Sequence, residues 1–271
     1  MNNIVVTLTT VPLRLNEQNE DFGIRPSLKT VLNQTDVQYE VHLNIPLEHR
    51  GEYITVPEWL REWQTIYPHL KVFRCKDYGP ITKIYPTIKR VSDPNTLIIT
   101  VDDDLFYVDG FIKSHIEARK RYPEYAIGYA GITSIDETLP ADHRGVHPTG
   151  KYHFTTSVPE DVRVRVLEGY KTVSYMRNFF SDDLDDFAFS YWADDEILSA
   201  YMGYKNIKKI VLACPSCDGD YTPRVETYPV ISHVPISGEI HGCNSFRNNE
   251  LIKNQTKATL DHWYKMGYLE R

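Results

Sequence analysis

Apolar runs typical of buried β-strands alternate with helix-like patterns along most of this chain. The strand-like runs are residues 3–10, 39–46, 70–75, 96–101, 125–132 and 207–214. The helix-like segments are residues 25–35, 56–68, 81–91, 109–123 and 193–206, with Pro86 interrupting the third of them. Because parallel strands are joined by helical crossovers, this alternation predicts an α/β fold with a mostly parallel central sheet flanked by helices.

The pattern becomes irregular in the second half of the chain. Residues 136–165 read as a long excursion, either a hairpin or a mobile loop, and Pro, Gly, Ser and Asn are frequent from Pro215 onward. We therefore predict a main domain over residues 1–214 and a C-terminal extension, residues 215–271, that wraps the same domain.

The charge balance limits the class of partner. With 30 Lys and Arg against 37 Asp and Glu, the 271-residue chain has a formal net charge of −7. This balance argues against nucleic acid as a partner, because a general nucleic-acid binder needs clustered cations to neutralise phosphates. A phosphate-containing ligand would have to be met by a metal ion or by a few placed cations.

The chain start and the cysteine count bear on location. The opening "MNNIVVTLTTVP" lacks the cationic start, the long apolar run and the cleavage site of a signal peptide. No stretch approaches the roughly 18 apolar residues of a membrane span. Four cysteines in a chain of this length do not make a disulfide scaffold. We expect a cytoplasmic protein without a transmembrane segment, and peripheral contact with a membrane stays open.

Three consecutive carboxylates, Asp102 to Asp104, follow the apolar run that ends at Val101. Ligands of open parallel sheets bind beyond the carboxyl ends of the strands, so these side chains mark a candidate binding edge. Strand alternation would place Asp102 and Asp104 on one face and Asp103 on the other. The pair would repel unless a cation lay between them, and a hard divalent ion meets that requirement. The alternative is a solvated acidic turn in which Asp102 or Asp103 caps a helix near Asp109.

A second acidic group, Asp194, Asp195 and Glu196, opens an expected helix shortly after Trp192, an aromatic of the kind that stacks on sugar faces. Ordinary capping at the helix N-terminus accounts for one of these carboxylates. A carboxylate held by free N–H groups near a bound cation is a candidate general base, which favours Asp195 or Asp194. A third acidic group, residues 182–186, reads as a solvated loop, with calcium or acceptor binding as the alternative.

Three thiols and one imidazole form a further candidate set: Cys214, Cys217, His241 and Cys243. These residue types suit a tetrahedral zinc ion. Their spacing is not that of a zinc finger, so buried or free thiols are the preferred interpretation.

Several motifs occur in a fixed order along residues 4–214: "VTLTTVPLR", "YGPITKIYPTI", "IITVDDDLFY", and "YMRNFF" followed by "ADDEILSAYMGYK". Together they resemble nucleotide-sugar glycosyltransferases of the GT-A fold, closest to small bacterial and viral enzymes that build surface polysaccharides. The most specific parts are the strand ending in three Asp and the "ADD" helix start. The resemblance implies a GT-A-like, Rossmann-like fold and a nucleoside-diphosphate sugar as donor.

The resemblance also implies roles for the carboxylates of the D-x-D motif. Asp102 would lie near the ribose, and Asp104 would bind Mn²⁺ or Mg²⁺ on the donor diphosphate. Asp103, inside the motif, is a further donor-binding candidate. A histidine from the C-terminal part completes the metal shell in several members, which makes His241, and less so His233, a candidate metal ligand.

Other matching positions would complete the site. Thr9 would lie by the nucleobase and ribose, while Arg14 and Lys83 would meet the nucleotide or its phosphates. Asp195, beside Asp194, matches the residue that deprotonates the acceptor hydroxyl in inverting members. Each donor-side residue also has a structural reading: Thr9 as a strand-end residue, Arg14 as a surface cation, and Lys83 as the partner of a surface acid.

The resulting hypothesis is a metal-dependent glycosyltransferase that moves a sugar, from a UDP-sugar in the first instance, to a hydroxyl of a glycan or lipid-linked glycan. Inversion follows from the assignment of Asp195 as base. Two alternatives stay open. One is a non-enzymatic calcium- or carbohydrate-binding protein. The other is a phosphohydrolase, although "DDDLF" lacks the D-x-D-x-[TV] context expected for a nucleophilic Asp.

Overall fold

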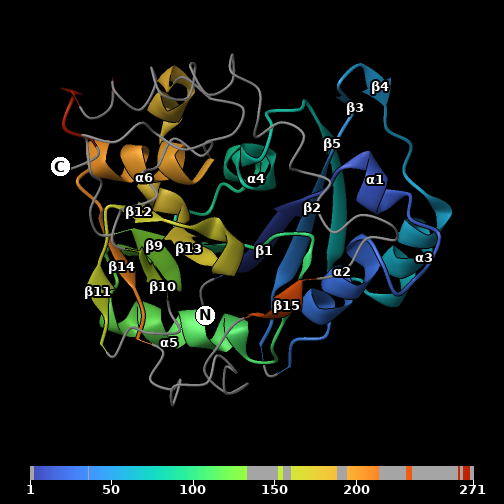
Figure 1. The fold of residues 1–271 in the computed structure, drawn as a ribbon, viewed down its shortest axis with the longest axis horizontal. Coiled ribbons are helices and arrows are strands. Elements are labelled where there is room, and N and C mark those ends of the chain that lie inside the picture. Colours follow the sequence, from blue (N-terminus) through green and yellow to red (C-terminus); the bar gives the residue numbers. More distant parts are fainter. Residues whose placement is uncertain are drawn as a thin grey trace.

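The computed structural model describes residues 3–35, 37–132, 152–154, 160–187, 194–213, 230–233, 262 and 265–268. An eight-stranded sheet runs through it in the order β11-β14-β8-β13-β6-β1-β2-β5 (Figure 1). Its strands are β1 (Ile4–Thr9), β2 (Glu40–Pro46), β5 (Leu70–Cys75), β6 (Leu97–Thr100), β8 (Tyr125–Gly128), β11 (Val162–Arg163), β13 (Val173–Met176) and β14 (Lys208–Val211). Strands β5, β2, β1 and β6 pair in parallel, as do β8 and β14, while β13 runs antiparallel between β6 and β8. This confirms the predicted α/β fold.

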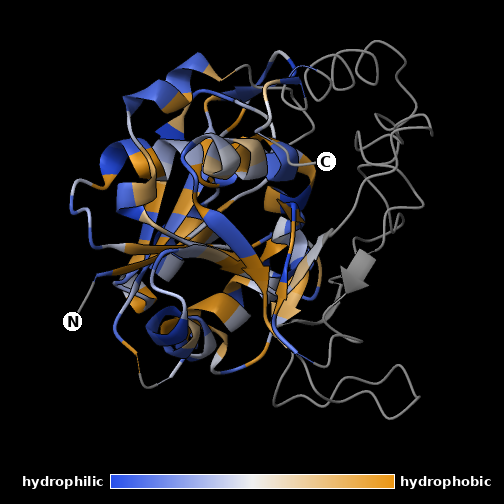
Figure 2. Ribbon diagram, turned by 90° about the vertical axis from the view of Figure 1, so that its left-hand side faces the viewer, coloured by the Kyte–Doolittle hydropathy of each residue, from blue (hydrophilic) through white to orange (hydrophobic). Residues whose placement is uncertain are grey.

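Helices flank the sheet: α1 (Pro12–Leu15), α2 (Ile24–Leu32), α3 (Glu58–Ile66), α4 (Tyr85–Arg90), α5 (Phe111–Arg121) and α6 (Asp194–Tyr204). Figure 1 shows α4 and α6 on one side of the sheet and α5 on the other. Figure 2 shows hydrophobic residues gathered along the strands and hydrophilic residues on the outward faces of the helices. In α2, the predicted apolar face of Leu28, Val31 and Leu32 is buried. Each such side chain stabilises the fold by about 1.5–3 kcal/mol.

The central strands carry continuous apolar runs because both faces of the sheet are covered. Val5, Val6 and Leu8 of β1 are all buried. Thr7, between them, is equally buried but polar, and its hydroxyl is hydrogen-bonded. The carboxyl ends of β1, β2 and β6 lie at the same edge of the sheet because these strands are parallel neighbours.

Shorter elements complete the described fold. The small strands are β3 (Glu48–His49), β4 (Glu52–Tyr53), β7 (Leu105–Tyr107), β9 (Ala130–Ile132), β10 (Tyr152–Phe154), β12 (Val166–Leu167) and β15 (Val230–His233). They form the sheets β3-β4, β10-β9-β12 and β15-β7. The 3₁₀ turns are η1 (Ile81–Lys83), η3 (Gly169–Lys171), η4 (Arg177–Phe179) and η5 (Asp182–Asp186).

One local expectation was wrong, and a second holds with a shifted position. The run 125–132 is not one strand, because the chain leaves the large sheet after Gly128 and β9 joins the small sheet with β12. Gly131 allows this close approach, since a Cβ there would lie 2.6 Å from the carbonyl oxygen of Val166. The segment 81–91 is divided, as expected, into η1 and α4, but the break lies at Ile84, and Pro86 lies in the first turn of α4, where its missing N–H costs nothing.

The described parts of the predicted extension pack on the main domain. Strand β15 pairs antiparallel with β7, and the ring of Tyr268 lies 5.2 Å from that of Tyr204 on α6. The boundary at residue 214 stays a prediction. Within the described ranges, no helix combines the length and the apolar character needed to cross a bilayer.

Candidate active site

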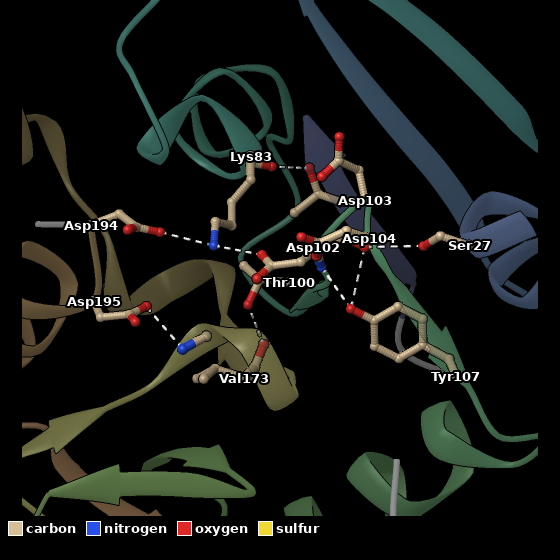
Figure 3. Close-up of polar contacts among 12 residues, drawn as sticks. Ser27, Lys83, Thr100, Asp102, Asp103, Asp104, Tyr107, Val173, Asp194 and Asp195 are labelled. Atoms are coloured by element: carbon tan, nitrogen blue, oxygen red, sulfur yellow. Dashed lines mark hydrogen bonds and ion pairs between the residues drawn. The ribbon is translucent and has the colours of Figure 1, made fainter. Parts of the chain in front are cut away.

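Lys83 joins the first two acidic groups of the sequence (Figure 3). Its Nζ atom lies 2.8 Å from Oδ1 of Asp102 and 2.9 Å from Oδ2 of Asp194. Asp102 follows the end of β6, Asp194 opens α6, and Lys83 comes from η1, which precedes α4. The side chain of Lys83 is only 10% exposed, so its charge is held away from bulk water. Lys83 therefore does not pair with an exposed surface acid but bridges the half-buried Asp102 and the buried Asp194.

Arg14 is the second cation of the site. It lies on α1, directly after β1, and its guanidinium forms ion pairs with Asp103 and with Asp104, the latter at 2.7 Å. Its side chain is 12% exposed, so the alternative reading as a surface cation is wrong. The guanidinium is well suited to hold two carboxylates at once.

The expected alternation of the three carboxylates was wrong in its detail. Strand β6 ends at Thr100, and Asp103 and Asp104 lie in a turn before β7. Asp103 and Asp104 therefore share Arg14, while Asp102 faces Lys83. The helix-capping alternative also fails, because β7 intervenes and α5 has Gly110 at its N-cap with no side-chain cap.

Two residues that sequence reasoning missed hold the main chain of Asp102. The hydroxyl of Tyr107 accepts a hydrogen bond from the Asp102 N–H at 2.7 Å, and the Ser27 hydroxyl donates to the Asp102 carbonyl at 3.2 Å (Figure 3). Burial, and then the charge of Asp102, raises the pKa of Tyr107 well above its usual value. Nothing in the local sequence indicates these contacts, because Ser27 comes from α2 and reaches Asp102 only in the folded chain.

Gly169 is a third residue that the sequence did not indicate. Its backbone N–H donates to Oδ1 of Asp195 at 2.9 Å. A Cβ at this position would lie 2.8 Å from that oxygen and 3.4 Å from Nζ of Lys83. A side chain at this position would therefore displace the Asp195 carboxylate, and glycine lets Asp195 and Lys83 occupy neighbouring positions.

The site has a surplus of negative charge. Burial lowers the pKa of Lys83, but the carboxylates of Asp102, Asp194 and Asp195 outweigh it and hold the pKa well above the usual range. Burial, and then Asp194, raises the pKa of Asp195 well above that of an ordinary carboxyl. Burial raises the pKa of Asp104 to about 7, against the opposing effect of Arg14. The raised values at Asp195 and Asp104 mean that the nearby cations do not fully offset burial and mutual repulsion.

The donor atoms of this site fit a hard divalent ion in chemistry and charge. Carboxylate oxygens are the ligands that Mg²⁺ and Mn²⁺ prefer, and Oδ2 of Asp103 is buried without a hydrogen-bond partner among the described residues. Asp102 and Asp104 would be the described ligands. The described residues contain no group of three or more His, Cys, Asp or Glu arranged for a metal, so further ligands would have to come from elsewhere. His241, Cys214, Cys217 and Cys243 all lie outside the described residues, as does Trp192.

Thr9 ends β1 at the same edge of the sheet, and its hydroxyl donates to the Asn44 carbonyl at 2.8 Å. It is half-buried. Its placement at the strand end matches the prediction, and its contact with a donor stays a prediction.

The third acidic group forms η5, in which Asp182, Asp185 and Asp186 are exposed, in line with the predicted solvated segment. Asp185 accepts a hydrogen bond from the Tyr85 hydroxyl at 2.7 Å and pairs with Lys89 at 2.7 Å, both on α4. Asp183 accepts from Tyr201 on α6 and pairs with Lys205 at 3.0 Å. These contacts tie η5 to both helices and favour a structural role over calcium binding.

Comparison with known proteins adds evidence at the level of the fold. No protein-family model matches the chain, and no curated protein matches it either. Among solved structures, GalNAc-T7 with UDP, GalNAc and Mn²⁺ aligns with a TM-score of 0.53 and 13% identity over 78% of this chain and 42% of that one. The 4-diphosphocytidyl-2C-methyl-D-erythritol synthase of Anaerococcus prevotii aligns with a TM-score of 0.51 and 12% identity over 96% of both chains.

TarS 1–349 of S. aureus in complex with UDP aligns with a TM-score of 0.45 and 14% identity, over 78% of this chain. This chain spans only 58% of that TarS structure and 42% of GalNAc-T7. Identities this low establish the fold and not the reaction. The chain has a GT-A-like fold.

Proposed function

We propose that this protein is a metal-dependent glycosyltransferase that moves a sugar from a nucleoside-diphosphate sugar, a UDP-sugar in the first instance, to a hydroxyl of a glycan or lipid-linked glycan. The observation that carries the proposal is the position of Lys83 between Asp102 and Asp194. It places the expected donor motif and the expected base motif side by side at one edge of the sheet. The GT-A-like fold supports the donor class, since GalNAc-T7, with the same fold, is described with UDP, GalNAc and Mn²⁺.

On the donor side, Arg14 and Lys83 are the cations that would meet the diphosphate, and Thr9 lies at the strand end where the nucleobase and ribose would bind. Asp102 and Asp104 would hold the divalent ion, with His241 as a predicted further ligand. When bound, the ion supplies Lewis-acid stabilisation of the departing nucleoside diphosphate. Arg14 pairs with Asp104 in this structure, so an ion held by Asp104 would compete with that ion pair.

On the acceptor side, we assign the general base to Asp195. Asp194 is committed to its ion pair with Lys83, whereas Asp195 is oriented by the N–H of Gly169. The raised pKa of Asp195, caused by burial and then by Asp194, makes it a stronger base than an ordinary carboxylate. It would accept the proton of the acceptor hydroxyl as the oxygen attacks the anomeric carbon, on the side opposite the leaving group, which gives inversion.

The first test is ligand-induced stabilisation. UDP with Mn²⁺ at about 100 times its dissociation constant is expected to raise the Tm by about 5 °C or more, because binding to the native state alone stabilises it. Differential scanning fluorimetry with UDP, GDP, dTDP and CDP, each with Mn²⁺ or with EDTA, measures the effect. Asp104→Asn should abolish the Mn²⁺-dependent part, while Asp182→Asn, at a fully exposed carboxylate outside the site, should not.

The outcomes separate the parts of the proposal. If a nucleotide raises the Tm equally in Mn²⁺ and in EDTA, the proposed dependence on a metal ion is contradicted. If no nucleotide changes the Tm, the proposed class of donor is contradicted.

Gly169→Ala provides a steric test of the base assignment. The added methyl group would lie 2.8 Å from Oδ1 of Asp195, so the carboxylate must move, and kcat is expected to fall about tenfold or more with little change in the donor KM. Initial rates of nucleotide release measure both constants. The control is Gly110→Ala, where φ is +86° and a Cβ meets no atom within 4 Å. It should lower stability through backbone strain and leave kcat unchanged. Equal kcat for Gly169→Ala and the native protein would contradict the assignment.

The alternatives raised from the sequence have no specific support in the described residues. A nucleophilic Asp of a phosphohydrolase would have to leave its ion pair, since Asp102 is bound to Lys83 and Asp104 to Arg14. In the third acidic group, Asp183 and Asp185 are likewise paired with lysines.

A further inference from the structure

Three fully buried polar side chains gather around the main-chain carbonyl of Lys83. The Thr7 hydroxyl donates to this oxygen at 2.5 Å, and the side-chain amide of Asn44 donates to it at 3.3 Å. The Thr87 hydroxyl lies 2.7 Å from that of Thr7 and accepts from the Asn44 amide at 3.0 Å. Thr7, Asn44 and Thr87 each have 0% exposed surface. They come from β1, β2 and α4: Thr7 and Asn44 contact the carbonyl directly, and Thr87 contacts both of them.

The orientation of the Asn44 amide is itself determined by a neighbour. Arg90 of α4 donates to Oδ1 of Asn44 at 3.0 Å, which directs the amide N–H groups toward Lys83 and Thr87. The Arg90 guanidinium lies 3.4 Å from the ring centroid of Phe73, so its own position is determined by packing. The amide therefore has a single favourable orientation within this network.

Core packing alone does not explain these residues. The neighbours of Thr7 on β1 are Val6 and Leu8, and valine at position 7 would fill a similar volume without a hydroxyl. A buried polar group destabilises the fold unless it is hydrogen-bonded, so a network of this kind is retained where its geometry matters. The main-chain group that Thr7 and Asn44 share as acceptor belongs to Lys83.

The geometry points to a positioning role. We propose that Thr7, Asn44 and Thr87 are positioning residues that hold the main chain of Lys83 so that its ammonium group reaches Asp102 and Asp194 together. Lys83 lies in a short 3₁₀ turn, which has little rigidity of its own, and a long side chain amplifies any backbone displacement. The catalytic consequence rests on the proposed function, whereas the structural coupling does not.

The first experiment tests the coupling without any activity. Thr7→Val is expected to lower the Tm by about 3 °C or more, because it leaves a buried carbonyl short of one donor. The same substitution also lets the Lys83 main chain move and so weakens the ion pairs with Asp102 and Asp194. In the Lys83→Met background, which keeps the carbonyl but removes the ammonium group, this second contribution is absent, and the Tm loss caused by Thr7→Val should be measurably smaller. Asp194→Asn replaces Lys83→Met as the background if the latter does not fold, since it also breaks the bridge.

The matched control is Thr100→Val. Thr100 is the register neighbour of Thr7 on β6, is equally buried, and donates to the Val173 carbonyl at 3.2 Å (Figure 3). Its Tm loss should be the same in both backgrounds. If Thr7→Val lowers the Tm by the same amount in the native and the Lys83→Met backgrounds, Thr7 is a structural residue and the inference is overturned.

The second experiment measures transfer. Thr7→Val should lower kcat about tenfold or more, Thr7→Ser should restore it, and Thr100→Val should leave it unchanged. If the native protein transfers sugar but Thr7→Val and Thr100→Val have the same kcat, the positioning role is wrong and the proposed function stands. If the native protein transfers no sugar with any donor, the proposed function fails, and the Tm cycle still decides whether the network positions Lys83.

Discussion

Asp195→Asn is expected to lower kcat by about 10²- to 10⁴-fold, the usual contribution of a general base, with a donor KM close to that of the native protein. The amide keeps the size of the carboxylate and can still accept the N–H of Gly169, but it cannot take a proton. Steady-state release of the nucleoside diphosphate measures both constants. Because burial, and then Asp194, raises the pKa of Asp195, native activity should fall as the pH decreases through a value well above that of an ordinary Asp.

Asp194→Asn is the matched comparison. It removes a neighbouring negative charge and the ion pair with Lys83, but it leaves Asp195 hydrogen-bonded to Gly169. Its kcat should fall less than that of Asp195→Asn, and the acid limb of its pH profile should move to lower pH, because the pKa of Asp195 then drops. If Asp194→Asn abolishes transfer and Asp195→Asn does not, the base is Asp194 and the assignment proposed above is wrong.

The second large effect concerns stability and a residue outside the site. His115 on α5 is fully buried, with its ring nitrogens 2.6 Å from the Thr172 hydroxyl and 3.0 Å from the Ser174 hydroxyl. Burial, and then the charge of Arg119, lowers the pKa of His115 to about 3. The unfolded chain binds a proton here near pH 6.5, while the folded chain stays neutral. The stabilisation is therefore fully present above about pH 6.5 and is lost as the pH falls toward 3.

This linkage predicts how steeply the free energy of unfolding depends on pH. Between about pH 6 and pH 4, His115 should lower the free energy of unfolding by roughly 1.4 kcal/mol for each pH unit. His115→Gln keeps hydrogen-bonding groups but does not titrate. The slope of its free energy of unfolding against pH should therefore be smaller than that of the native protein by the contribution of His115. Urea unfolding at several pH values, with m checked for constancy, measures the difference. Other groups contribute equally to both proteins, so parallel stability curves for the two would contradict the prediction.

Much of the fold follows from local sequence patterns. The apolar runs that became β1, β2 and β6 are buried because of their composition, and the alternating helices impose parallel pairing. The position of Asp102 at the carboxyl end of β6 follows from the same reasoning, as does the placement of Asp194 and Asp195 at a helix start. These features depend on residues within one element, which is why a single sequence predicts them.

Other features depend on where the chain turns. Alternation could not predict the partners of Asp103 and Asp104, because the strand ends at Thr100 and side-chain direction in a turn depends on its local backbone. For the same reason the run 125–132 looked continuous in sequence, although the chain passes from one sheet to another after Gly128.

The sequence by itself determined the α/β class, the edge of the sheet where Asp102 to Asp104 lie, and the helix start that carries Asp194 and Asp195. Only the tertiary structure decided which cation pairs with which carboxylate. It placed Lys83 between Asp102 and Asp194, Arg14 against Asp103 and Asp104, and the N–H of Gly169 on Asp195. These contacts join residues far apart in the chain. Coulomb and hydrogen-bond energies depend on distances of a few ångströms, which local sequence patterns do not encode.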